Sequence, residues 1–153
     1  MLSTRLVQMI EDHAEQLTRG LITDLQENPL TSEYHKLSPA EIHRRVYDVY
    51  HNLGEWLGHE SEEVVEAHYS RLGKQRALDG VPLSQVLYAL IRTKNHLFDF
   101  IRTAGLFDSA VGLYQLQELR RLVDNFFDKA FYYAARAYER ELALPCASSA
   151  LAG

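Results

Sequence analysis

Residues 71–105 read RLGKQRALDGVPLSQVLYALIRTKNHLFDFIRTAG, and this stretch decides the fold. Apolar residues recur in it every three or four positions, which is the pattern of an α-helix with one face in a core. These residues are Leu83, Val86, Leu87, Leu90, Leu97 and Ile101. Ile91 and Phe98 widen the apolar arc, so we expect this helix to contact neighbours on two sides.

The turn before this helix is Asp79-Gly80-Val81-Pro82. Gly80 can adopt the left-handed conformation that ends a helix. Pro82 suits the first turn of the next helix, where its missing N–H has no helical partner to lose. Gly105 is expected to end the second helix as Gly80 ends the first. So short a link predicts that the two helices pack against each other or cross at a sharp angle.

The bulk properties indicate one ordinary globular domain. The chain has 153 residues, of which 46% are hydrophobic and 24% charged. A formal net charge of −5 argues against a general nucleic-acid binder, which would carry a basic stripe. The single cysteine, Cys146, excludes an internal disulfide. The N-terminus lacks a signal-peptide pattern, and no apolar run is long enough to cross a bilayer, so we expect a soluble cytoplasmic protein with no membrane partner.

Upstream of the central stretch, residues 2–26 have a helical apolar stripe, within which Gly20 could mark a kink or a break. Asn28-Pro29 ends this pattern, because a residue before proline avoids helical geometry. Residues 31–37 fit either a loop or a single helical turn.

A strong helix start follows at Ser38-Pro39-Ala40-Glu41. Ser38 can cap the helix, Pro39 fits its first position, and Glu41 completes a capping box. We expect this helix to end near Gly58 and another to run from about Glu60 to Asp79.

The last helix is expected to start at Asp108 and reach about Leu142. It has more aromatic residues than one buried stripe uses, which predicts a second buried face against another subunit. The whole pattern predicts an all-α bundle of five to seven helices, the last two long, over residues 1–142, with a disordered tail at 143–153.

The central stretch carries a family resemblance. Gly73, Arg76, Gly80, Pro82 and Leu83, with the apolar stripe through Leu97, resemble the N-terminal domain family of RsbRD, the RsbT co-antagonist proteins. The resemblance implies a globin-like fold that generally lacks haem, pairs into dimers through its terminal helices and acts as an input module of bacterial stress signalling. In that family a STAS phosphoacceptor domain, a kinase or another output typically follows. Only a short tail follows Leu142 here, so we expect any signalling to run through a separate protein partner.

The residues that could support catalysis or metal binding form no convincing set. Carboxylate pairs such as Glu11 with Glu15 lie on polar faces, where solvated charge is the usual explanation. No histidine pair has the spacing of three or four residues that helical metal sites favour. No glycine-rich phosphate loop is present. We therefore expect neither an enzyme nor a metal protein; an enzyme of unknown type is kept as a distant rival.

One histidine leaves two interpretations open. In a globin-like layout His68 lies on the inward stripe of the helix that would carry the proximal haem ligand. Val46, Val49, Leu90 and Phe98 could help line such a pocket. Alternatively, His68 is a partly buried histidine with a hydrogen-bonded neighbour, and the protein has no cofactor. His96 is a weaker second candidate that we expect to face solvent or an interface.

Around the central turn, the chain is locally basic through Arg71, Lys74, Arg76, Arg92 and Lys94. This cluster could contact an acidic partner or form salt bridges with nearby acids, for example Glu66 or Asp99.

Together these patterns predict a regulatory or sensory homodimer that acts through protein–protein contacts, with a haem or small-ligand sensor using His68 as the alternative. We assign the dimer contact to Phe98, Ile101, Leu119, Phe126, Phe127 and Tyr133.

Overall fold

The computed structural model describes residues 4–57, 62–103 and 110–144. In these ranges the chain is all-α, with no β-strand. The elements are α1 (Thr4–Asp12), α2 (Ala14–Glu27), a 3-10 helix η1 (Pro29–Lys36), α3 (Pro39–His51), α4 (Leu53–Trp56), α5 (Glu62–Leu78), α6 (Leu83–Thr103) and α7 (Ala110–Ala143). The all-α prediction with two long final helices is confirmed.

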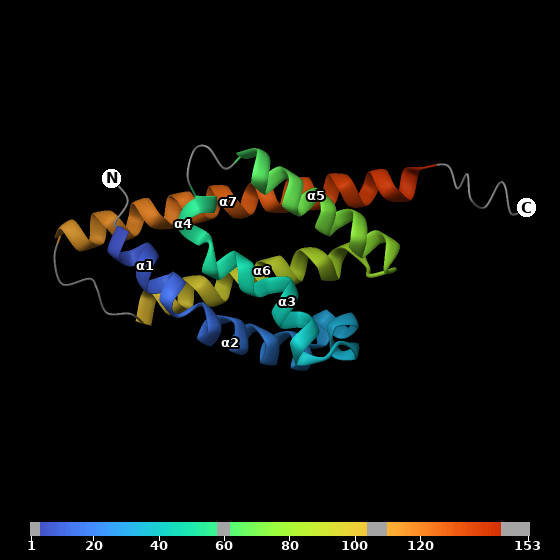
Figure 1. Ribbon diagram of the computed structural model, residues 1–153, viewed down its shortest axis with the longest axis horizontal. Coiled ribbons are helices and arrows are strands. Elements are labelled where there is room, and N and C mark those ends of the chain that lie inside the picture. The colour runs from blue at the N-terminus through green and yellow to red at the C-terminus, as the bar shows by residue number, and fades with distance from the viewer. Residues whose placement is uncertain (1–3, 58–61, 104–109, 145–153) are drawn as a thin grey trace, which may run out of the picture.

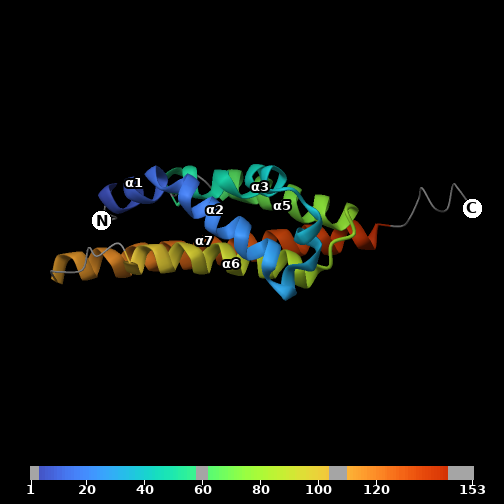
Figure 2. The ribbon, with the colours of Figure 1, turned by 90° about the horizontal axis from the view of Figure 1, so that it is seen from below.

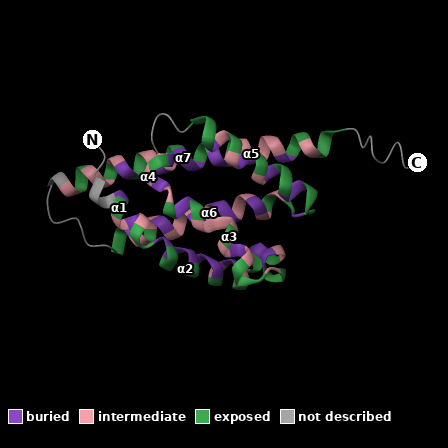
Figure 3. Cartoon of the chain, viewed as in Figure 1, coloured by how far each residue is buried: buried purple, intermediate pink, exposed green. Residues whose placement is uncertain are grey.

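The helices form two layers. Seen edge-on, α6 and α7 lie in one layer, α1, α3 and α5 lie above it, and α2 descends toward α6 (Figure 2). α7 is the longest element, and both of its ends extend past the other helices (Figure 1). Buried residues follow the middle of α7, where it meets α5 and α6, while its ends are largely exposed (Figure 3).

The turn between α5 and α6 has the predicted chemistry. Gly80 has φ +75°, and its N–H bonds to the Ala77 carbonyl at 3.1 Å. The N–H of Val81 reaches back to the Arg76 carbonyl, also at 3.1 Å. These two bonds form a Schellman motif, which requires a left-handed residue just past the helix end. Gly105, the other predicted stop, and Asp108, the predicted cap of the last helix, lie outside the described residues.

The main partner of α5 is α7 rather than α6. The two helices run parallel, because Tyr69 meets Phe126 and, farther along both helices, Gly73 meets Ala134. A Cβ on Gly73 would fall on the carbonyl oxygen of Ala134, far inside van der Waals contact. Small residues therefore set the approach of these backbones, and α5 contacts α7 more extensively than it contacts α6.

α6 runs antiparallel to α7, since Lys94 lies near Asp124 and Phe98 lies under Arg120. On its other sides α6 contacts α2, and the Tyr50 hydroxyl of α3 donates to the Thr93 carbonyl at 2.9 Å. The prediction that this helix has neighbours on two sides is confirmed.

Two predicted helices are interrupted in the structure. The first breaks at His13, and α2 continues through Gly20, so the predicted break position was wrong. The helix starting at Pro39 stops at His51, and α4 begins after Asn52. Its expected end at Gly58 and the next expected start at Glu60 lie outside the described ranges.

The predicted helix start at Ser38 is present in the structure, although not in every detail. The Ser38 Oγ accepts the Glu41 N–H at 3.2 Å, as predicted. The Glu41 carboxylate, however, pairs with Arg44 and Arg45 instead of completing the capping box. The ambiguous segment after Asn28 forms η1, in which Thr31 departs from helical geometry and bonds to the Leu25 carbonyl at 2.8 Å.

Candidate functional site

His68 lies on α5 and lines a small cavity in the core. Its ring is flanked by Trp56 and Tyr69, each with a ring centroid 4.8 Å away. Burial lowers the pKa of His68, and the nearby Arg71 lowers it further, whereas Asp48 acts in the opposite direction. The imidazole is therefore predominantly neutral at pH 7.

The cavity next to His68 lies between α3, α5 and α6 and has a volume of about 30 Å³. Two polar atoms at this site, His68 Nε2 and the Tyr69 hydroxyl, are buried and have no hydrogen-bond partner among the described residues. A water molecule requires roughly 10–15 Å³ of such space and two to four polar partners. The cavity therefore suits a guest the size of one or two water molecules.

A haem does not fit this cavity as the side chains are packed. Val46, Val49 and Leu90 line it, as expected for the predicted pocket, but Phe98 lies elsewhere, between α6 and α7. Trp56 lies against the His68 ring, and a macrocycle needs many times the space present. The residues present therefore do not fit a haem without large rearrangement of α3 and α5.

His96 was expected to face solvent or an interface, but it is half-buried and lies against Asp24 of α2. Its Nε2 lies 2.8 Å from Asp24 Oδ2, and Arg92 Nε donates to the same oxygen at 2.6 Å. Asn28 donates to the other carboxylate oxygen at 3.2 Å. Burial alone would raise the pKa of Asp24, but the hydrogen bonds from Arg92, His96 and Asn28 outweigh it and hold the pKa below its ordinary value.

This Asp24 cluster joins α2 to α6 across 68 and 72 residues of sequence. The spacing of Arg92 and His96, one helical turn apart, is a signal that two cationic donors share a face. No sequence pattern near these two residues, however, indicates that Asp24 on α2 is their acceptor.

The basic residues around the central turn largely form internal salt bridges. Arg76 pairs with Asp79 at 2.6 Å, and Lys94 is 3.9 Å from Asp124. The acids proposed from the sequence have other partners: Glu66 pairs with Arg136 and Asp99 with Arg102. Arg71 and Lys74 line a shallow hollow between α5 and the end of α7.

The six residues assigned to a dimer contact fall into two groups. Ile101, Leu119, Phe126 and Phe127 are at most 4% exposed within a single chain. Phe98 and Tyr133 are half-buried; Phe98 lies under the Arg120 guanidinium, and the Tyr133 hydroxyl donates to Glu62 at 2.9 Å. The assignment stays a prediction, and only the second group keeps surface that a partner can cover in this packing.

None of the helices in the described ranges combines the length and apolar character needed to cross a membrane. The same ranges contain no group of three or more His, Cys, Asp or Glu side chains placed to hold a metal ion.

Comparison with curated proteins and with solved structures gave no match. The family model described as the RsbT co-antagonist protein rsbRD N-terminal domain matches residues 11–145, which include every described helix from α2 to α7. The chain therefore belongs to the RsbRD N-terminal domain family.

Proposed function

We propose that this protein is a non-enzymatic regulatory module of bacterial stress-type signalling, which works as a homodimer and acts through protein–protein contacts. Membership of a family of regulatory signalling domains, which is not a known enzyme family, supports the regulatory role. The observation that supports pairing is the uncovered side of the α6–α7 layer (Figure 2).

We call this side the outer face, and we infer from helical spacing that it carries Ile91 of α6 together with Phe131 and Ala135 of α7. Ile91 on α6 is half-buried and lies outside the buried stripe of this helix, which includes Val86, Leu90 and Leu97. Phe131 on α7 is half-buried beneath the Lys94 ammonium, 5.8 Å from the ring centroid. A second copy packed on this face would bury these side chains and would pair long helices, which is the geometry of helical bundles.

A dimer of this kind would use half-buried residues in its contact, because only these have exposed surface that a partner can bury. A stable protein–protein contact buries about 800 Å² per partner, which two helices of this length can supply. Phe98 remains at the edge of the proposed contact. Residues already enclosed in the core, such as Phe127, would support the face from behind.

The test is the oligomeric state of Ile91→Glu and Ala135→Glu in light scattering over a range of micromolar concentrations. Both positions are half-buried, and Ala135 lies one turn after Phe131 on α7. Because glutamate is a good helix former, we expect folded monomers from both variants and a dimer from the wild type.

The matched control is Val64→Glu, on the far layer, where Val64 is 48% exposed. It should remain a dimer. A wild-type protein that stays monomeric at high micromolar concentration would remove the dimer from the proposal and leave the regulatory role without its mechanism.

The rival function, a haem sensor with His68 as ligand, is less well supported. Its favourable observation is the buried Nε2 without a hydrogen-bond partner in the described part of the chain; against it stands the 30 Å³ cavity. We expect haem titration to give no absorbance change that depends on His68. A Soret shift in the wild type that disappears in His68→Ala would make haem binding the better proposal.

A further inference from the structure

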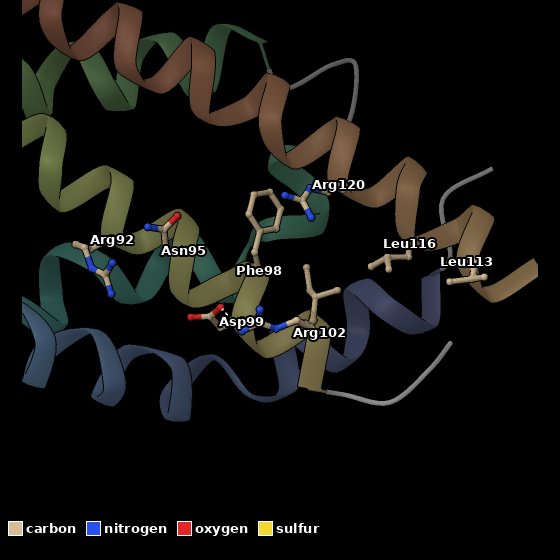
Figure 4. A pocket seen from close by; sticks show the side chains of 9 residues that line it. Arg92, Asn95, Phe98, Asp99, Arg102, Leu113, Leu116 and Arg120 are labelled. Atoms are coloured by element: carbon tan, nitrogen blue, oxygen red, sulfur yellow. Dashed lines mark hydrogen bonds and ion pairs between the residues drawn. The ribbon is translucent and has the colours of Figure 1, made fainter. Parts of the chain in front are cut away.

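A groove runs between the C-terminal half of α6 and the N-terminal half of α7 (Figure 4). Its volume is about 480 Å³, within the range of roughly 300–1,000 Å³ that is usual for small-molecule sites. The polar lining comes from Arg92, Asn95, Asp99, Arg102 and Arg120, and the apolar lining from Phe98, Ile101, Leu113 and Leu116. We call it the α6–α7 groove.

The polar lining has more positive than negative charge. Three arginines and one carboxylate line it, in a chain whose net charge is −5. Arg92 is paired with Asp24, which does not line the groove. Arg102 pairs with Asp99 at 2.9 Å. Arg120 stacks on the Phe98 ring at 4.8 Å and has no carboxylate partner in the described ranges.

These arginines keep hydrogen-bonding capacity. A guanidinium has five N–H donors, and Arg92 uses its Nε for Asp24. The Asn95 side chain lies between Arg92 and Phe98 along the groove (Figure 4). The groove therefore offers several donors and excess positive charge to an oxyanion.

The apolar lining continues from Phe98 toward the start of α7. Leu113 and Leu116 lie at that end of the groove, away from Arg92 (Figure 4). Leu113 is 48% exposed. A single occupant can therefore meet arginines with one end and leucines with the other.

We propose that the α6–α7 groove binds a small amphipathic anion, in which a carboxylate or a similar oxyanion is carried by an apolar body of about ten carbon atoms. The anion would pair with Arg120 and its neighbouring donors, and the body would cover Leu113 and Leu116. A neutral apolar molecule would desolvate the arginines without compensation. An inorganic anion would leave the leucines exposed to water.

The binding proposal rests on a groove within one chain, so it goes beyond the proposed function and does not depend on the dimer.

The experiment uses the full chain with two anionic probes, the fluorescent dye 8-anilinonaphthalene-1-sulfonate and decanoate. We expect saturable dye fluorescence that decanoate displaces with one molecule bound per chain. Decanol and the decylammonium cation, which have the same body without the negative charge, should displace at least tenfold more weakly. Light scattering at the same concentrations separates this result from the oligomeric state.

Two variants locate the site. Arg120→Gln should weaken decanoate binding about tenfold, because one charge-assisted contact is lost, and Leu113→Ser should weaken it as well. Arg121→Gln is the matched control, since Arg121 is the next residue but pairs with Glu118 and does not line the groove. The proposal is overturned if decanoate fails to displace the dye, if decanol displaces it equally, or if Arg120→Gln and Arg121→Gln have the same effect.

Discussion

At the scale of single residues, the carboxylate of Asp24 is the centre of a hydrogen-bonded cluster that joins two helices. It receives hydrogen bonds from Arg92, His96 and Asn28, and its side chain is only 16% exposed. The cluster fixes α2 against α6 with a charge that is both paired and partly removed from water. Removing the charge while keeping the shape leaves these three donors facing a weaker, uncharged acceptor.

Asp24→Asn should therefore lower the free energy of unfolding by about 1.5–3 kcal/mol, measured by urea denaturation at pH 7. Asp99→Asn is the control, because Asp99 is exposed and pairs only with Arg102 of its own helix; it should change stability by less than about 0.5 kcal/mol. Equal effects would mean that the Asp24 cluster does not hold α2 and α6 together.

The same comparison has a pH dependence of known sign. The pKa of Asp24 is lower in the folded state than its ordinary value of 3.8. Its stabilising contribution is thus complete above pH 3.8 and is lost as the pH falls through the folded-state pKa. The stability difference between wild type and Asp24→Asn should shrink over that acidic range.

His68 gives a prediction at milder pH. Because burial lowers its pKa below 6.5, the unfolded chain takes up a proton before the folded protein does, and stability falls as the pH drops below about 6.5. His68→Leu should remove this part of the pH dependence between pH 7 and the folded-state pKa. A wild-type slope that His68→Leu retains would show that His68 titrates as it does in water.

At the scale of elements, the packing of α5 on α7 depends on small side chains. Gly73 and Ala77 are one turn apart on α5, and Ala130 and Ala134 are one turn apart on α7. Such spacing lets two helix backbones approach closely. The result is that α5 packs onto the α6–α7 layer mainly through α7, although α6 follows α5 directly in sequence.

Gly73→Ala should lower the free energy of unfolding by about 3 kcal/mol, near the upper end for overpacked cores, because the new methyl group meets backbone atoms of Ala134 that cannot turn aside. Gly20→Ala is the matched control. A methyl group there meets the His96 ring at an ordinary 3.6 Å, so this variant should gain up to about 1 kcal/mol from helix propensity. Urea unfolding curves of both variants decide the matter, and a harmless Gly73→Ala would contradict the close approach of α5 and α7.

Helix starts and stops at this scale were predictable where the signal lies within one turn. The Ser38 cap and the left-handed Gly80 are both present as predicted. The breaks at His13 and Asn52 were not predicted, because neither position carries a glycine or proline and the helical apolar spacing continues through both. These breaks let α1 and α4 pack against each other. The stabilisation from this packing comes from residues that are distant in sequence.

At the scale of the whole molecule, the long α7 and the uncovered outer face of the α6–α7 layer are the features that a dimer would use. If two copies share that face, unfolding also separates them, and stability depends on protein concentration. The thermal midpoint of the wild type should therefore rise by about 2 °C for each tenfold increase in concentration.

Ile91→Glu should remove this concentration dependence, while Val64→Glu should retain it. Calorimetry or circular dichroism melts over a hundredfold concentration range provide the measurement. A midpoint that is constant for the wild type would leave the outer face without a second copy.

The sequence by itself determined the helical class, the corner at Gly80, the cap at Ser38 and the family, because each of these is written in residues within a few turns of one another. The tertiary structure alone decided that α5 pairs with α7, that His96 serves Asp24, and that Phe126 and Phe127 are enclosed in one chain. Those outcomes depend on whether side-chain volumes and charges from distant segments match when they meet. A local pattern carries no record of that match.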